Sequence, residues 1–428
     1  MLNIIIEEVV MKRIDIRVLC LFLCIGTVQW YGLKAQIVLD ENLRKETVIQ
    51  IAKIMEEKYV LPDIGKKYSE TILKKQDSGQ YDHITDASEL ALKLIEDFNH
   101  IHEDKHLNIR YDPGLIQNIK RQSGMSESER EKSFERQKLE ERRRNYGLTE
   151  LKILPGNVGY FKLNEFPSSR GSETIISAMG FIQYTDAVIL DLRENTGGNP
   201  EIIQLLGSYF FDEITYFSSI YNRLTDKTIQ YKTLLYVPGK CMPDTKLYIL
   251  TGEHTFSAAE AFAYDFMQLK RAIVVGGKTT GGAHPTNRFI VNDHYVIYVP
   301  FAQAINPITN SNWEGTGIEP DIQCKAEDAL MVAYEMALDS IIYDNKDEYF
   351  INNLGYAILS SNMVELAIKV FIKNVGFFPN SFNVYDSLGE AYMKNGDTQM
   401  AIENYKKSLE LNPSNDNAKK MLKQLEKK

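Results

Sequence analysis

Hydrophobic residues recur every three or four positions in the first third of the chain, as they do along one face of an α-helix. Within residues 41–98 this spacing is clear at Ile51 and Ile54, and again at Leu90 and Leu94. Helices with one apolar face need a partner that covers that face. We therefore predict a small helical domain, which we place at residues 41–112.

A different pattern follows, in which apolar residues become scarce. Residues 117–147 are dominated by Lys, Arg, Glu, Gln and Ser. This composition is typical of a solvated helix or a mobile insertion. A functional alternative is a lid over an active site. We treat residues 113–150 as a charged insertion or linker.

From residue 158 onward, short apolar runs alternate with helical patterns. Strands are predicted at 158–163, 187–190, 247–250 and 273–275, helices at 173–182, 202–211 and 258–269, and a hairpin at 289–299. Strands that alternate with helices indicate an α/β layered domain. We place this domain at residues 151–340.

The tail contains an internal repeat. Its positions are Leu354, Gly355, Ala367, Phe371 and Pro379, which recur as Leu388, Gly389, Ala401, Tyr405 and Pro413 at a spacing of 34 residues. This spacing and these residue types resemble tetratricopeptide repeats. Residues 346–428 would then hold two repeats and, from Ser414 onward, a capping helix. Such repeats either bind a protein partner or only cover an apolar patch of the α/β domain, and the sequence leaves both open.

The N-terminus has the pattern of a targeting signal. A short, net positive stretch at residues 11–17 precedes an apolar run at residues 18–28. The two correspond to the first two regions of a secretory signal peptide, and the run is too short to span a bilayer comfortably. We predict a signal peptide at residues 1–35, cleaved at Ala35, and an exported protein in the periplasm or outside the cell. The alternative is an uncleaved N-terminal anchor.

Composition narrows the class of protein. The chain has 428 residues, of which 44% are hydrophobic and 25% charged, and this excludes a disordered chain. Its net charge of −9 and the lack of a long basic run argue against nucleic-acid binding. After signal cleavage only Cys241 and Cys324 remain, too few for a disulfide scaffold. They could pair in an oxidising compartment, but the sequence does not place them together.

Three segments carry candidate chemistry. Gly197 and Gly198 follow a buried strand, where backbone N–H groups can point at a ligand oxygen, although an ordinary tight turn gives the same pattern. Ser257 lies where a strand gives way to a helix, so that its hydroxyl and the N–H of Ala258 would be exposed. A serine that merely caps the helix is the alternative. Glu314 is a lone carboxylate in a glycine-punctuated loop.

Together these segments resemble one family, which includes the C-terminal processing peptidases, the tricorn core proteases and interphotoreceptor retinoid-binding protein. The resemblance covers about residues 45–340. The most similar branch lacks a PDZ domain and carries an Asp-x-His-Leu motif, present here as Asp104-Lys105-His106-Leu107. The resemblance implies a ClpP/crotonase-like layered β/α core, a serine peptidase acting on protein or peptide substrates, and no metal or cofactor.

The resemblance also assigns roles. Ser257 matches the nucleophile, His106 the general base and Glu314 the carboxylate of the catalytic group. The oxyanion donors match Gly197 or Gly198, together with Ala258. A serine hydroxyl is a weak nucleophile and needs a base within hydrogen-bond reach, for which a histidine near neutrality is suited. If Glu314 lies beside His106, its charge raises the pKa of the imidazole, and activity should rise with pH near or somewhat above ~6.5.

The C-terminal processing branch instead pairs the serine with a lysine. That lysine would fall at Gly282, so the chain departs from this branch, and Lys278 lies four positions too early. His254 is an alternative base, although we expect it to shape the turn before Ser257. We expect His284 to be an ordinary loop residue, with a place in the pocket as the alternative.

Two competing functions remain. Residues 102–106 fit the zinc motif His-Glu-x-x-His, but that motif needs a continuous helix, and the strand-like alternation of residues 107–111 follows at once. The retinoid-binding relatives use the same fold without catalysis, so a binder of an apolar ligand or a peptide terminus is the main alternative. The presence of His106, Ser257 and Glu314 favours catalysis.

Overall fold

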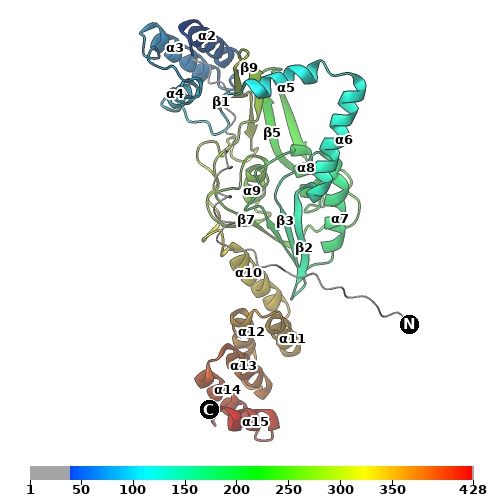
Figure 1. Ribbon diagram of the computed structural model, residues 1–428. Helices are drawn as coiled ribbons and strands as arrows, with labels where there is room; N and C mark the ends of the chain where they lie inside the picture. The colour runs from blue at the N-terminus through cyan, green and yellow to red at the C-terminus, as the bar shows by residue number, and fades with distance from the viewer. Residues whose placement is uncertain (1–38, 427–428) are drawn as a thin grey trace, which may run out of the picture.

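The computed structural model describes residues 39–426 and shows three parts arranged in a row (Figure 1). A helical part lies at one end, an α/β part in the middle and a helical tail at the other end. The predicted signal peptide, residues 1–35, lies outside the described residues. Between residues 39 and 426, no helix combines the length and apolarity that a membrane crossing requires.

The first part is built from three helices and one strand. Its elements are α2 (Glu41–Lys58), α3 (Pro62–Asp77), α4 (Ala87–Asn99) and β1 (Asn108–Tyr111). Side-chain carboxylates of Asp40 and Asp86 accept backbone N–H groups at the starts of α2 and α4, which are unsatisfied within the helices themselves. The apolar faces meet in a core that includes Met55, Leu90 and Leu94.

Strand β1 joins this part to the rest of the molecule. It pairs antiparallel with β10 (Tyr295–Pro300), which also pairs with β9 (Thr286–Ile290). Tyr295 and Ile297 of β10 lie in the same core as the helices, and the Tyr295 hydroxyl donates to the Ala87 carbonyl, 208 residues away in sequence (2.8 Å). The helical part therefore completes its core with a strand from much later in the chain.

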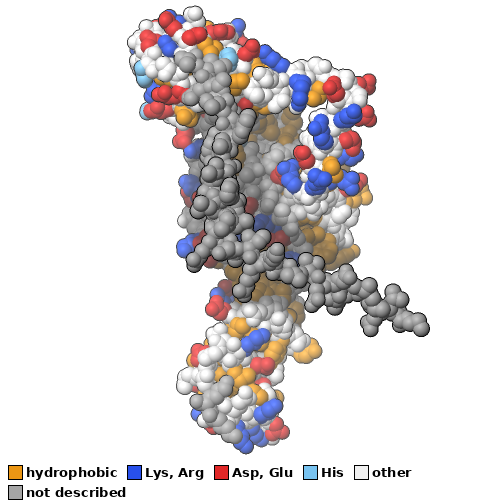
Figure 2. Space-filling view, viewed as in Figure 1, with side chains coloured by type: hydrophobic (Ala, Val, Ile, Leu, Met, Phe, Trp, Pro, Cys, Tyr) orange, Lys and Arg blue, Asp and Glu red, His pale blue; other side chains and the backbone are white. Residues whose placement is uncertain are grey.

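The charged segment forms two helices on the surface. Helices α5 (Pro113–Ser123) and α6 (Glu127–Arg143) lead from the first part down the side of the α/β part (Figure 1). Their exposed side carries many Lys, Arg and Glu side chains (Figure 2). One acidic residue of α6 faces inward: Glu141 accepts two hydrogen bonds from Arg170 and one from Ser168. This buried pair fixes the end of α6 on the α/β part.

The middle part is built around a six-stranded sheet in the order β12-β8-β7-β4-β3-β2. The strands are β2 (Leu148–Leu154), β3 (Val158–Leu163), β4 (Ala187–Asp191), β7 (Lys246–Thr251), β8 (Ile273–Gly276) and β12 (Ile322–Gln323). All neighbours pair in parallel except β2 with β3. The strands predicted at residues 158–163, 187–190, 247–250 and 273–275 are confirmed.

Helices cover both faces of this sheet, as the fold prediction required. One face carries α7 (Ser172–Ile182), α8 (Pro200–Ser208) and α9 (Ala258–Gln268), and the other carries α10 (Ala329–Asp344). In β4, Val188 and Leu190 pack on the first side and Ile189 on the second, because successive strand side chains point to opposite faces. The predicted α/β layered core is confirmed.

Cys241 and Cys324 are free thiols, so they do not form a disulfide in this structure. Cys241 packs against the core on the α7–α9 face, and Cys324 against the core on the α10 face. The sheet separates them.

A second small sheet, in the order β11-β5-β6, was not predicted. Its strands are β5 (Tyr216–Asn222), β6 (Lys227–Lys232) and β11 (Ala302–Ile305). The remaining short elements are the 3₁₀ turns η1 (Asn145–Gly147) and η2 (Ser169–Gly171).

The tail consists of antiparallel helix pairs. Its helices are α11 (Glu348–Ser360), α12 (Val364–Phe377), α13 (Phe382–Asn395), α14 (Thr398–Leu411) and α15 (Asp416–Leu425). The first pair lies directly on the α/β part: a Cβ at Gly156, in the turn between β2 and β3, would be 2.7 Å from Leu338 of α10 and 3.1 Å from Leu354 of α11. The core on the α10 face therefore continues into the first repeat.

The repeat glycines allow a direct test of this packing. A Cβ on Gly355 would lie 2.5 Å from the Phe371 ring, whereas a Cβ on Gly376, in the partner helix, would meet nothing within 4 Å. We expect Gly355→Ala to destabilise the protein by about 1–3 kcal/mol, because the two helices must move apart. Gly376→Ala, the matched control, should be neutral or stabilising by up to ~1 kcal/mol, since alanine favours the helix. Thermal unfolding midpoints of the two variants would measure the difference, and equal midpoints would contradict the helix contact.

Candidate active site

Ser257 lies between the end of β7 and the start of α9, where the chain turns sharply. Its backbone has φ 54° and ψ −117°, a conformation that costs a residue other than glycine about 1–3 kcal/mol. Ser257 is also the N-cap residue of α9 and forms a capping box with Glu260, but an ordinary N-cap residue has an extended backbone. The geometry is that of a strand–turn–helix elbow, which exposes the side chain at its tip.

The buried carboxylate of Glu260 holds this turn in place. It accepts hydrogen bonds from the Ser257 N–H (2.9 Å) and from the N–H groups of Gly281 (2.7 Å) and Gly282 (2.9 Å). The Thr279 hydroxyl donates to it as well (2.5 Å). Burial raises the pKa of Glu260, while these hydrogen bonds oppose the rise. One side chain thus ties the Ser257 turn to the glycine-rich turn opposite.

The turn after β4 contains Gly197 and Gly198, and the N–H groups of these two glycines differ in their hydrogen bonds. The Gly197 N–H donates to Asn195 Oδ1 (2.8 Å), so it is not free for a ligand. Across residues 39–426, the N–H groups of Gly198 and Ala258 have no hydrogen-bond acceptor. Both residues line the same cavity as Ser257. Gly197 instead allows close approach, because a Cβ there would be 2.9 Å from the Ser257 Cβ.

His106 also lines this cavity. The cavity has a volume of about 420 Å³. Its ring packs against Phe256, with ring centroids 4.4 Å apart. The imidazole Nδ1 is buried without a hydrogen-bond partner in the described part of the chain, and no hydrogen bond joins the ring to the Ser257 hydroxyl. Hydrogen bonds between catalytic groups are often long in ligand-free enzymes and tighten when substrate binds. The sequence-predicted pair therefore shares one cavity without direct contact.

Burial lowers the pKa of His106 to about 4, while the charge of Asp104 opposes this shift and His284 adds to it. The expectation that a neighbouring Glu314 would raise this pKa is wrong. The imidazole loses more by leaving water than it gains from the carboxylate nearby. At neutral pH the ring is uncharged, the state in which it can accept a proton.

Glu314 acts on backbone groups and not on the His106 ring. Its carboxylate accepts hydrogen bonds from the N–H groups of Ala283 (2.5 Å) and Lys105 (3.3 Å), and it lies 3.6 Å from Nδ1 of His284. Burial, followed by the negative charge of Asp104, raises the pKa of Glu314 to about 7.

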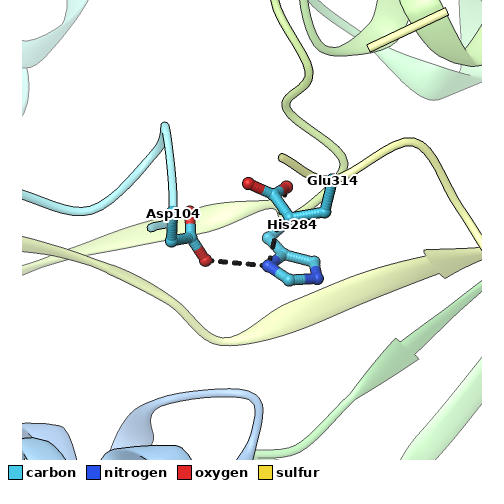
Figure 3. Close-up of side chains that lie close together, drawn as sticks. All are labelled: Asp104, His284 and Glu314. Carbon is cyan, nitrogen blue, oxygen red and sulfur yellow. Dashed lines mark hydrogen bonds and ion pairs between the residues drawn. The ribbon is translucent and has the colours of Figure 1, made fainter. Parts of the chain in front are cut away.

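Asp104 and His284 complete the site, and neither was predicted as a site residue. His284 Nδ1 is 2.8 Å from Asp104 Oδ2, and the ring lies between the carboxylates of Asp104 and Glu314 (Figure 3). All three side chains are at least nine-tenths buried. Two features of the sequence could have indicated these residues. Asp104 belongs to the Asp-x-His-Leu motif, and His284 closely follows the turn at Gly281 and Gly282.

These three residues also form the group best placed to hold a metal ion in the described chain, with ligand atoms within 4.8 Å of one another. The direct contact between His284 Nδ1 and Asp104 instead fits a hydrogen bond, in which Nδ1 carries a proton. The zinc motif does not form: α4 ends at Asn99, so His102 and His106 do not share a helix.

The alternative bases are not at the site. His254 is exposed beside Glu253 and lines a separate cavity. A side chain at Gly282 has no room, because its Cβ would be 2.3 Å from the Phe256 ring and 2.5 Å from the His106 ring. The lysine of the Ser/Lys branch and the histidine at position 106 therefore exclude one another sterically.

Sequence comparison agrees with this geometry. Residues 157–324 match the profile of peptidase family S41, and residues 34–141 match the N-terminal domain of peptidase S41 in eukaryotic IRBP. The chain belongs to peptidase family S41. The predicted family is confirmed, and with it the class of serine-type peptidases. Residues 387–415 of this S41 chain also match a tetratricopeptide repeat, which confirms that prediction for the second repeat.

Individual relatives are distant. A carboxyl-terminal-processing protease of Picosynechococcus is 27% identical over 44% of this S41 chain and 46% of its own length. Carboxyl-terminal-processing peptidase 3 of Arabidopsis thaliana, described as chloroplastic, is 27% identical over 39% of this chain and 31% of its own. The chain thus spans less than half the length of these curated relatives.

Solved structures are similar over more of the chain. A putative peptidase from Parabacteroides merdae has a TM-score of 0.46 at 18% identity and covers 69% of this chain and 96% of its own. The tricorn protease has a TM-score of 0.44 at 14% identity and covers 71% of this chain and 37% of its own.

The buried state of His106 predicts the pH dependence of this S41 chain. If His106 is the base, only its neutral imidazole can accept a proton, so activity should appear as pH rises through the pKa of His106. We expect the rising limb of kcat/KM near pH ~4, well below the ordinary histidine value of ~6.5. Glu314→Gln should lower the rate without moving this limb, since Glu314 contacts backbone and His284 but not the His106 ring. A limb near pH ~6.5 in the wild type, or a shifted limb in Glu314→Gln, would contradict the geometry.

Proposed function

We propose that this protein is a serine peptidase that hydrolyses peptide bonds through Ser257, His106 and Glu314. One observation carries the proposal: the Ser257 elbow, the uncharged His106 and two unused N–H groups all face one cavity. Nucleophile, base and oxyanion donors are the parts that acyl transfer requires.

The chemistry follows from these positions. His106 accepts the hydroxyl proton of Ser257 while the serine oxygen attacks the substrate carbonyl. The N–H groups of Gly198 and Ala258 stabilise the negative charge that develops on the carbonyl oxygen. The protonated imidazole then gives its proton to the leaving amine, which departs and leaves an acyl-enzyme. Water, activated by the same imidazole, releases the acid and restores Ser257.

Substrate binding is assigned to the apolar wall of the cavity. Ile203, Ile220 and Ile229 line it together with Phe301 and Trp313. This wall suits an apolar side chain of an extended peptide. The same wall would suit the alternative function, a binder of an apolar ligand or a peptide terminus, which reactivity at Ser257 separates from a peptidase.

Reaction with a fluorophosphonate probe tests the proposal. We expect the wild type to be labelled at Ser257 and to cleave an unstructured protein, and Ser257→Ala to do neither. His106→Ala and the Ser257/His106 double variant should lose about as much activity as Ser257→Ala, because members of one catalytic group are not additive. His254→Ala is the matched control and should keep wild-type rates. A wild type that binds peptides but is never labelled would support the non-catalytic binder.

We further propose that the protein is exported after cleavage of the signal peptide and that its tail binds a protein partner or substrate. The N-terminal pattern of residues 11–28 supports export, and the tetratricopeptide match supports protein binding. The first repeat also has a structural role, because Leu354 packs at the turn between β2 and β3.

Two truncations separate these roles of the tail. Removing residues 381–428 should leave cleavage of a short peptide within about twofold and lower that of a large protein substrate, since the active-site cavity is untouched. Removing residues 346–428 should lower both, because it uncovers the apolar face of α10 around Leu338. Steady-state rates on the two substrates, with solubility measured alongside, provide the readout. Unchanged cleavage of the large substrate by the shorter truncation would argue against recruitment by the repeats.

A further inference from the structure

We propose that Asp104 and His284 are positioning residues that fix the loop carrying His106 against the α/β part. The proposal builds on the assignment of His106 as the base. Nothing in the sequence comparison assigns a role to either residue.

Asp104 binds the backbone of the base and not its ring. Its Oδ1 accepts the N–H of His106 (3.0 Å), and its Oδ2 accepts the hydroxyl of Tyr59 (2.9 Å) and contacts Nδ1 of His284 (2.8 Å). In a serine–histidine–aspartate triad the carboxylate would bind the Nδ1 of the base. Among residues 39–426 that nitrogen has no hydrogen-bond partner, so the loop backbone, and not a ring hydrogen bond, determines where the imidazole lies.

The contacts join segments that are far apart in sequence. Tyr59 ends α2 and Asp104 follows α4, so both belong to the helical part. His284 follows the glycine-rich turn of the α/β part, and Glu314 contacts both sides, through Lys105 and His284. Asp104 and His284 therefore link the two parts of the molecule at the base itself (Figure 3).

The link is strong because it is buried. Burial alone would raise the pKa of Asp104, but the hydrogen bonds of His284, His106 and Tyr59 outweigh it and hold the carboxylate ionised. A buried charge that loses its partners is far more costly than one in water. Breaking one contact therefore disturbs the whole group.

The decisive measurement is the pKa of His106 by NMR in histidine-labelled full-length protein, which does not depend on activity. In Asp104→Ala the loop is released, so His106 should enter water and its pKa should rise from about 4 toward ~6.5. If Asp104 supplied only charge, its removal would lower the pKa instead. Asp104→Asn keeps an acceptor for the His106 N–H without the charge, so the pKa should stay at or below about 4.

Asp97→Ala is the matched control. Asp97 is a buried carboxylate of the same helical part that accepts the hydroxyl of Tyr81 (2.6 Å) and ion-pairs with Lys75, and it does not line the cavity. The pKa of His106 should stay near 4 in this variant. A fall in Asp104→Ala, or an equal rise in Asp97→Ala, would overturn the proposal. Near-UV circular dichroism identifies any variant that fails to fold.

If Asp104→Ala does not fold, the kinetics of His284 variants test the positioning role instead. His284→Asn can keep a donor near the position of Nδ1, whereas His284→Leu cannot. We expect His284→Leu to lower kcat by about 10²-fold with KM within about twofold, as a displaced base does, and His284→Asn to lose at least tenfold less. Equal losses in both would overturn the proposal. A wild type without peptidase activity would defeat the proposed function, while the NMR titration would still test the positioning.

Discussion

The Glu260 carboxylate is the interaction on which the rest of the site depends. It fixes the N–H of Ser257, a residue held at positive φ, and the N–H groups of the turn at Gly281 and Gly282. The carbonyl of Gly282 in turn accepts the indole N–H of Trp313 (2.9 Å), directly before Glu314. Ser257, the surface that contacts His106 and the loop that carries Glu314 are thus aligned on one buried side chain.

The same alignment favours histidine over lysine as the base of the proposed mechanism. The space beside Phe256 that a longer side chain at Gly282 would fill is occupied by the His106 ring. In the proposed mechanism the base comes from the helical part and not from the turn at Gly281 and Gly282. The His106 ring lies in an apolar setting there, and its loss of contact with water is the main influence on its pKa.

The sequence was sufficient for the features that depend on local pattern. The strands and helices around Ser257 could be predicted because short apolar runs alternate with stretches in which apolar residues have helical spacing. The elbow could be predicted because a serine lies between a strand and a helix. The sheet β11-β5-β6 escaped prediction because β6 has only two apolar residues, Ile229 and Tyr231, among four polar ones, an alternation too short to mark a strand. His284 escaped because its meaning depends on Asp104, 180 residues away. The shift in the pKa of His106 was predicted in the wrong direction. The residues next to His106 in the sequence do not show which distant segments bury its ring.

The pairing of β1 with β10 has a consequence for the order in which the protein matures. The ribosome releases the helical part first, and domains generally begin to fold as they emerge. Here the core of that part lacks Tyr295 and Ile297 until β10 has been made. His106, which belongs to this part, therefore reaches its final position only after the segment that carries Ser257 has been synthesised.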